Sequence, residues 1–291
     1  MAEKNPAARL VDLIQQPLEK YPAWIEPVVL PKRGMMLFGA HSKAGKSLMA
    51  MEACRALGTG SNLFGYGGFR TEECRVLYVE AEVGVYGLHG RASKVFADED
   101  VVRIADNVWY VSQNPDLMLD TEVGLLRLCD EVDRTQANVV ILDPISSMFT
   151  VDENDASGMT ALFNRLERLR RKFRQNDLSI IMVHHFGKPP TGKFSDSYDH
   201  LSFHNFRGSS KFFSVPDTVC TAWRAEELNL GWESWRLKAR WVCRQGESPP
   251  EMYLNVNAQQ DLRVRWERNS LTNRKPQGEK ELKPVRFSPA S

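Results

Sequence analysis

The sequence lacks the features that identify several common classes of protein. Its 291 residues contain five cysteines and no C-x-x-C pair, so neither a zinc site nor a disulfide framework is expected. It has no signal peptide and no apolar run of membrane length, so we expect no membrane partner. Internal repeats and long low-complexity tracts are also missing. These absences predict a protein of the reducing cytoplasm.

An excess of one charge sign is missing too. The chain has 38 Lys and Arg residues against 37 Asp and Glu residues, which gives a formal net charge of +1. Bulk attraction to nucleic acid is therefore not expected, and any basic surface must be local. With 42% hydrophobic residues, the composition is that of a globular protein. The length fits one large α/β domain with appendages, or two small domains.

One segment matches a complete phosphate-binding loop, G-x-x-x-x-G-K-[ST]. Residues 35–38 before it predict a strand, and residues 47–57 after it predict a helix without Gly or Pro. This strand–loop–helix context is the one in which the motif binds phosphate. The loop consists of Gly39, Ala40, His41, Ser42, Lys43, Ala44, Gly45, Lys46 and Ser47.

The residue types in this loop suit a nucleoside triphosphate. Gly39 and Gly45 allow backbone geometry that a side chain would block, so that the loop N–H groups can converge on phosphates. Lys46 would reach the β- and γ-phosphates, and the Ser47 hydroxyl would bind Mg²⁺. The sequence therefore predicts ATP and Mg²⁺ as cofactors.

Two later strands end in carboxylates. Residues 75–79 form a buried-strand pattern that ends at Glu80-Ala81-Glu82, and the apolar run 139–142 ends at Asp143. The carboxyl ends of parallel strands meet at the edge where α/β sheets bind ligands. Asp143 is predicted to hold the Mg²⁺ shell. The two glutamates either polarise the attacking water or are solvated at a strand end.

A further strand, 178–183, ends at His184-His185, either of which would sense the γ-phosphate. The long loop 186–206 follows, with basic and aromatic residues interleaved. Such residues suit contact with the backbone and bases of single-stranded DNA. The alternative is that the aromatic side chains fold back onto the core. The DNA-binding candidates are Lys188, Lys193, Phe194 and Tyr198.

Alternating segments in the C-terminal third predict antiparallel strands at 217–224, 234–243, 251–256 and 261–266. Lys238 and Arg240 would share one strand face. Two cations there either reach an ATP on an adjacent subunit or belong to an ordinary exposed strand. The helix predicted at 157–174 has a basic outer face, which is either solvated or in contact with nucleic acid or a neighbouring subunit.

The order of these motifs resembles that of RecA-type P-loop ATPases and is most similar to RepA-like hexameric replicative helicases, with DnaB-like helicases as more distant relatives. The resemblance covers about residues 24–256. Its more particular pointers are residues 154–158, the His184-His185 pair and the run Arg207-Gly208-Ser209-Ser210.

The resemblance implies an α/β RecA-like core, with a mostly parallel twisted sheet flanked by helices and extended by C-terminal antiparallel strands. It implies a homo-oligomer, a hexameric ring with ATP between subunits, and loops after Asp143 and His185 that hold single-stranded DNA. Glu82 would be the catalytic carboxylate, although Glu80 lies two residues away. Arg207 or the pair Lys238/Arg240 would act on a neighbouring subunit's ATP.

We expect three parts: an N-terminal helix and extended arm (1–33), the ATPase domain (34–268) and a polar, disordered tail (269–291). The arm packs either on its own domain or on a neighbour. Three functions compete: an ATP-driven ring helicase, a DNA-binding ATPase switch such as a recombination mediator or loader, and a P-loop small-molecule kinase. Separate replication or recombination proteins are possible partners of the first two.

Overall fold

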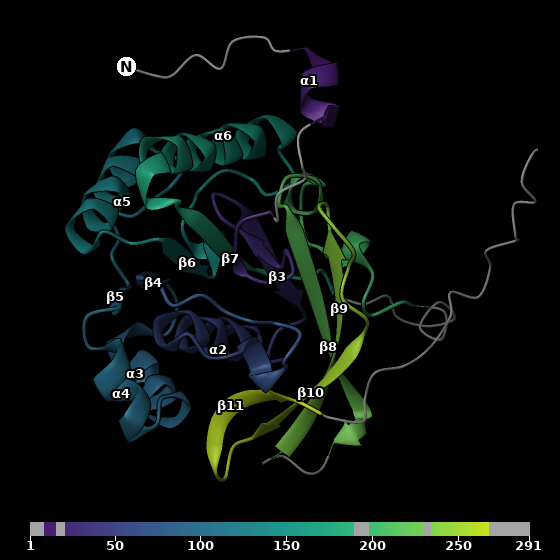
Figure 1. The fold of residues 1–291 in the computed structure, drawn as a ribbon. Helices are drawn as coiled ribbons and strands as arrows, with labels where there is room; N and C mark the ends of the chain where they lie inside the picture. The colour runs from purple at the N-terminus through teal and green to yellow at the C-terminus, as the bar shows by residue number, and fades with distance from the viewer. Residues whose placement is uncertain (1–8, 16–20, 189–197, 230–233, 268–291) are drawn as a thin grey trace, which may run out of the picture.

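The computed structural model describes residues 9–15, 21–188, 198–229 and 234–267 (Figure 1). The strands in these ranges are β1 Ala23–Ile25, β2 Leu30–Pro31, β3 Met35–Ala40, β4 Val76–Glu80, β5 Val108–Ser112, β6 Val139–Asp143, β7 Ser179–His185, β8 Thr218–Asn229, β9 Ser234–Cys243, β10 Met252–Asn257 and β11 Asp261–Trp266.

Nine of these strands form one sheet in the order β11-β10-β9-β8-β3-β7-β6-β4-β5. The strands from β8 to β5 pair in parallel. The extension β9, β10 and β11 is antiparallel. The expected α/β architecture, a mostly parallel sheet with C-terminal antiparallel strands, is confirmed.

Helices lie on both faces of the parallel strands, with α5 and α6 on one face and α2, α3 and α4 on the other (Figure 1). In the described ranges, no helix is long and apolar enough to span a membrane. All five cysteines are free thiols. The α-helices are α1 Leu10–Gln15, α2 Lys46–Thr59, α3 Gly84–Val95, α4 Asp98–Ile104, α5 Glu122–Thr135, α6 Ala156–Lys172 and α7 Lys211–Ser214.

The alternation of side chains along each strand divides the core between these two faces. In β3, Met36 and Phe38 join the apolar cluster that contains α2 residues. Met35 and Leu37 join the cluster that contains α6 residues. Because β3 is buried on both faces, it fits a continuous apolar run, and its carboxyl end is held rigidly where the phosphate loop begins.

Helix α6 buries one apolar face, which consists of Met159, Leu162, Phe163, Leu166 and Leu169. Its outer arginines are paired with carboxylates. Arg165 and Arg168 both contact Glu122, and Arg170 and Arg171 contact Glu167. This pairing fits the alternative of an ordinary charged helix surface.

The N-terminal arm packs on its own chain. Trp24 is buried, and its Nε1 donates a hydrogen bond to the carbonyl of Asp177 at 3.1 Å. Ile25, Val29 and Leu30 are fully buried in the same cluster as α2. The open question of where the arm packs is therefore answered for the described residues 21–33.

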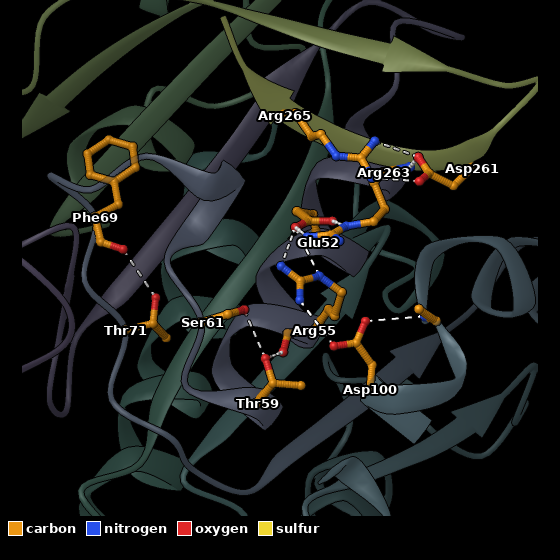
Figure 2. A network of polar contacts seen from close by, with 11 residues as sticks. Glu52, Arg55, Thr59, Ser61, Phe69, Thr71, Asp100, Asp261, Arg263 and Arg265 are labelled. Carbon is orange, nitrogen blue, oxygen red and sulfur yellow. Dashed lines mark hydrogen bonds and ion pairs between the residues drawn. The ribbon is translucent and has the colours of Figure 1, made fainter. Parts of the chain in front are cut away.

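A buried ionic cluster ties the antiparallel extension to the helix after the phosphate loop (Figure 2). Glu52 of α2 contacts Arg55 at 2.7 Å and Arg263 of β11 at 3.3 Å. Arg55 also reaches Asp100 of α4 at 3.4 Å. Because Glu52 and Arg55 are almost fully buried, each charge depends on its partners for stabilisation. The cluster therefore fixes β11 against α2.

Candidate nucleotide-binding site

The phosphate loop joins β3 to α2 and has the left-handed turns that the motif requires. Gly45 has a φ of 106° and Lys43 a φ of 62°. A Cβ on Gly39 would lie 2.2 Å from the Phe206 ring, so only glycine fits there. The loop therefore has both the conformation and the close packing that its glycines predict.

Lys46 is buried inside this loop, and its Nζ donates a hydrogen bond to the carbonyl of His41 at 2.8 Å. Burial lowers the pKa of Lys46 to about 8, although the charges of Asp143 and Glu82 oppose this shift. An arriving polyphosphate would favour the charged form of the amine, because it brings negative charge to a desolvated cation.

Asp143, at the end of β6, faces the first turn of α2. The Ser47 hydroxyl donates to its Oδ1 at 3.0 Å, and the Tyr78 hydroxyl donates to its Oδ2. Burial raises the pKa of Asp143, while these hydrogen bonds lower it. Tyr78 is absent from the sequence prediction because an aromatic residue in a buried strand gives no sign that its hydroxyl reaches a carboxylate.

The pair Ser47–Asp143 fits a Mg²⁺ ion that phosphate oxygens and water also bind. Among the described residues, no group of three or more His, Cys, Asp and Glu side chains could hold a metal by itself. Mg²⁺ in nucleotide sites commonly takes one or two protein ligands and completes its shell with phosphates and water. The donor set therefore suits a metal that arrives with a nucleotide.

The two neighbouring glutamates have different environments. Glu80 is buried, and its carboxylate accepts hydrogen bonds from Gly84 N at 2.9 Å, from Ser112 Oγ at 3.0 Å, and from the backbone N–H groups of Glu82 and Val83. These contacts anchor the start of α3. Glu82 is exposed and lines the cavity beside the phosphate loop. The geometry therefore separates a structural acid from an accessible one.

The two histidines at the end of β7 also differ. His184 is fully buried, stacks on Phe212 with ring centroids 3.8 Å apart, and donates through Nε2 to the carbonyl of Arg207 at 2.9 Å. Burial lowers the pKa of His184 to about 4. His185 is half-buried and lines the cavity, and burial lowers its pKa as well. Of the two candidates, His185 is the one at the cavity.

Of the groups described above, Lys46, Ser47, Glu82, Asp143 and His185 line a cavity of about 410 Å³. It receives residues from the ends of β4, β6 and β7, and also from β9 and β11. Three of the lining side chains, Arg91, Trp235 and Leu262, are absent from the sequence prediction because no motif marks them. The cavity is lined by Ser42, Lys43, Gly45, Lys46, Ser47, Leu48, Glu82, Val83, Arg91, Asp143, Pro144, Val183, His185, Trp235 and Leu262.

The cations predicted to act on a neighbouring subunit lie outside this cavity's lining. Arg207 is 69% exposed in its side chain and contacts Glu153 at 2.9 Å. Lys238 and Arg240 share a strand face, as predicted, and both contact Glu251. Arg240 also contacts Asp199 at 2.6 Å. Arg207 is therefore the most exposed of the three candidates.

The described part of the loop after β7 folds back onto the core. Phe186 and Phe206 are buried, and the Tyr198 ring lies 6.3 Å from the ring of His41 in the phosphate loop. His200 also contacts His41, with ring centroids 6.0 Å apart. Of the DNA-binding candidates, Lys188 is exposed and Tyr198 half-buried, while Lys193 and Phe194 lie outside the described residues.

The aromatic residues described in this loop thus match the alternative of packing on the core. The same contacts connect the loop to the phosphate loop through His41. Burial and the neighbouring His200 lower the pKa of His41, and its Nε2 has no hydrogen-bond partner among the described residues.

Comparison with known proteins agrees with the nucleotide-site geometry. A family model described as an AAA domain matches residues 3–191. The match includes the phosphate loop, Glu82, Asp143 and the two histidines. A search of curated proteins gave no match. The chain belongs to the AAA domain family of P-loop ATPases.

Proposed function

We propose that the chain is an ATP-hydrolysing oligomeric DNA motor, a RepA-like ring helicase that translocates on single-stranded DNA. Lys46 and the phosphate loop bind the phosphates, Ser47 and Asp143 hold Mg²⁺, and Glu82 polarises the attacking water. His185 senses the γ-phosphate. These roles follow from the chemistry that phosphoryl transfer requires, which is positioning and charge stabilisation.

The observation that carries this proposal is the accessibility of Glu82 in the same cavity as Lys46, Ser47 and Asp143. A carboxylate that activates water must reach the water, and Glu80 is occupied by the N–H groups at the start of α3. Glu82 is therefore the catalytic carboxylate in this proposal.

In a ring, a neighbouring subunit can supply a cation to the ATP, and none of the three candidate cations lines this chain's own cavity. We assign the role of a cation acting on the neighbouring subunit to Arg207, because it is exposed and held near the end of β7. Exposed apolar side chains support self-association, because contiguous apolar surface marks interaction sites. The described ones near the β5 edge are Val85, Tyr86, Val101, Val102 and Tyr110.

The DNA part of the proposal rests on the resemblance to RepA-like helicases and on the loop after β7. Lys188 is exposed at its start, where it would meet a phosphate backbone. Lys193, Phe194 and Tyr198 complete the proposed contact. Charge removal at Lys188 and Lys193 together is expected to weaken single-strand binding and reduce its salt dependence.

The test is ATP hydrolysis measured across protein concentrations, with and without single-stranded DNA. A rate per subunit that rises with both concentration and DNA supports sites shared between subunits and a DNA channel. A rate that is flat in both contradicts the motor and favours a self-contained ATPase or a small-molecule kinase.

A second candidate is a DNA-binding ATPase switch, a mediator or loader that unwinds nothing. The contacts of His41 with Tyr198 and His200 favour it, since they connect the nucleotide loop directly to the proposed DNA loop. Unwinding of a forked duplex separates the two. DNA-stimulated hydrolysis with strand separation supports the helicase, and the same hydrolysis without strand separation supports the switch.

A further inference from the structure

We propose that Trp235 is a nucleotide-binding residue: β9 and β11 form the wall that receives the nucleoside, and the Trp235 indole N–H donates a hydrogen bond to it. The inference rests on the proposed function in one respect, namely that ATP occupies the cavity. It assigns a role to the antiparallel extension that the phosphate-loop motifs do not.

The sheet order sets the direction in which the nucleotide lies. From the phosphate loop on β3, the strands that end at Asp143 and Glu82 lie on one side, in the order β7, β6 and β4. Trp235 belongs to β9 on the other side, whereas β11 with Leu262 folds over α2 and contacts both α2 and α3. Because Mg²⁺ and the attacking water meet the γ-phosphate, the nucleoside must extend away from Asp143 and Glu82. That direction leads to Trp235, and Leu262 closes the cavity from above α2.

Trp235 has an unpaired donor at this place. The residue is only 9% exposed, and its Nε1 has no hydrogen-bond partner among the described residues. A Cβ placed on Gly45 would lie 3.6 Å from this atom, so the N–H edge of the indole faces the turn of the phosphate loop. Buried indole N–H groups normally find a partner. A nucleotide bound at Gly45 would supply one.

The other unpaired indoles in the described residues differ in position. The Nε1 atoms of Trp241 and Trp266 also lack partners, but neither residue lines the cavity. Trp241 is buried among Phe38, Phe64 and Phe69. Trp266 packs on Tyr66, with ring centroids 4.9 Å apart. Trp235 is therefore the unpaired indole that a cavity ligand can reach.

The surroundings of Trp235 hold the ring in place. The Arg224 guanidinium lies 4.7 Å from the ring centroid, and Leu237 on the same strand approaches Gly45. Leu48 and Leu262 add apolar surface beside it in the cavity. The contact between Glu52 and Arg263 fixes β11 against α2 one residue from Leu262 (Figure 2). An aromatic donor on a rigid apolar wall suits a ribose and base better than a phosphate.

The test compares the full chain with Trp235→Phe and Trp235→Ala, and uses Trp266→Phe as the matched control. The probes are MgADP, a non-hydrolysable ATP analogue with Mg²⁺, and inorganic tripolyphosphate with Mg²⁺. Calorimetry gives each Kd, and tryptophan fluorescence gives nucleotide-dependent quenching. Circular dichroism checks the fold of each variant.

We expect Trp235→Ala to raise the Kd of both nucleotides about tenfold and Trp235→Phe to raise it about fivefold. The Kd of tripolyphosphate should stay within about twofold, since tripolyphosphate has no nucleoside. Trp235→Phe should also remove most nucleotide quenching, whereas Trp266→Phe should keep both affinity and quenching.

Three results would contradict the proposal that Trp235 binds the nucleoside. In the first, folded Trp235→Phe and Trp235→Ala bind ADP as the wild type does. In the second, both variants lose tripolyphosphate and ADP affinity in the same ratio. In the third, Trp266→Phe weakens nucleotide binding as much as Trp235→Phe does. A wild-type chain that binds neither nucleotide nor tripolyphosphate would instead overturn the proposed function.

Discussion

The parallel and antiparallel parts of the sheet contribute to the same cavity in different ways. On the parallel side, charged side chains stand at or just beyond strand ends: Lys46 after β3, Glu82 after β4 and Asp143 at the end of β6. On the antiparallel side, Trp235 and Leu262 lie within strands β9 and β11. The strand ends supply the charged groups that we propose bind phosphate and Mg²⁺, and the strand faces supply an apolar wall. The site is thus built from two kinds of position.

The largest expected effect comes from removing the phosphate contact on the parallel side. Lys46→Ala should lower ATP hydrolysis by about 10³-fold or more, because a buried cation aimed at the phosphates is lost. Unlike Trp235→Ala, Lys46→Ala should weaken the binding of tripolyphosphate as well as that of ADP. Calorimetry with both ligands checks this, with Lys94→Ala on exposed α3 surface as control. A wild-type affinity of Lys46→Ala for tripolyphosphate would contradict the proposal that the parallel side binds the phosphates and the antiparallel side binds the nucleoside.

The next effect tests which side supplies the cation to a neighbour. Arg207→Ala should lower the DNA-stimulated kcat by about 10³-fold, the scale of an arginine acting on transferring phosphate. Lys238→Ala on β9 is the matched control, since Lys238 is paired with Glu251.

Mixing the two inactive variants sharpens the same prediction. In mixed rings, Arg207→Ala subunits keep Lys46 while Lys46→Ala subunits keep Arg207, so some interfaces contain both groups. Activity should therefore reappear on mixing. If Lys238→Ala lowers kcat as much as Arg207→Ala does, or if mixing restores no hydrolysis, Arg207 is not the cation that acts on the neighbouring ATP. That role would then belong to Lys238 and Arg240.

The third effect concerns the connection between the two parts. Glu52→Gln should lower the free energy of unfolding by about 3 kcal/mol, because Arg263 loses its contact with a buried carboxylate and the buried Arg55 keeps only the longer contact with Asp100 at 3.4 Å. Urea unfolding measures this. Glu122→Gln, which removes an exposed partner of Arg168, is the control and should change stability much less. Equal losses in the two variants would mean that the cluster does not fix β11.

The smallest effect is a pH dependence on the parallel side. Burial holds the pKa of His184 near 4, below the 6.5 of an unfolded histidine, so the folded state favours the neutral ring. The stability from this group is complete above pH 6.5 and falls as the pH drops toward 4, by about 2 kcal/mol between pH 7 and 5. His184→Gln should flatten urea unfolding curves measured across that window. An unchanged slope in His184→Gln would contradict a pKa of His184 that burial holds low.

The sequence predicted the parallel part well because its patterns are local. An apolar strand followed by Gly, Asp, Glu or His indicates both the strand and the edge where its last residue lies, so β3, β4, β6 and β7 were found within a few residues. The segment 217–224, predicted as antiparallel, is the start of β8, which runs to Asn229 and pairs in parallel with β3 and antiparallel with β9. The antiparallel strands at 234–243, 251–256 and 261–266 were also found, because their alternation is regular. Their place in the cavity was not, since it depends on how β9 and β11 fold over α2.

Neighbouring candidates were separated by burial, which no local pattern reports. Glu80 and Glu82 have the same chemistry two residues apart, yet only the structure shows that N–H groups at the start of α3 occupy Glu80. His184 and His185 differ in the same way, since one packs on Phe212 and the other lines the cavity. The pairing of Lys238 and Arg240 with Glu251 joins β9 to the residue just before β10, a contact that no local pattern shows.

The most direct test of the account is single-turnover hydrolysis of ATP by Glu82→Gln and Glu80→Gln, with MgATP affinity measured alongside. Glu82→Gln should bind MgATP within about threefold of the wild type and hydrolyse it about 10²- to 10⁴-fold more slowly, since it keeps the phosphate site and loses the base. Glu80→Gln should lower the melting temperature, because Glu80 anchors the start of α3, and should lower the hydrolysis rate much less than Glu82→Gln does. A wild-type rate of hydrolysis in Glu82→Gln would contradict the assignment of Glu82 as the catalytic carboxylate.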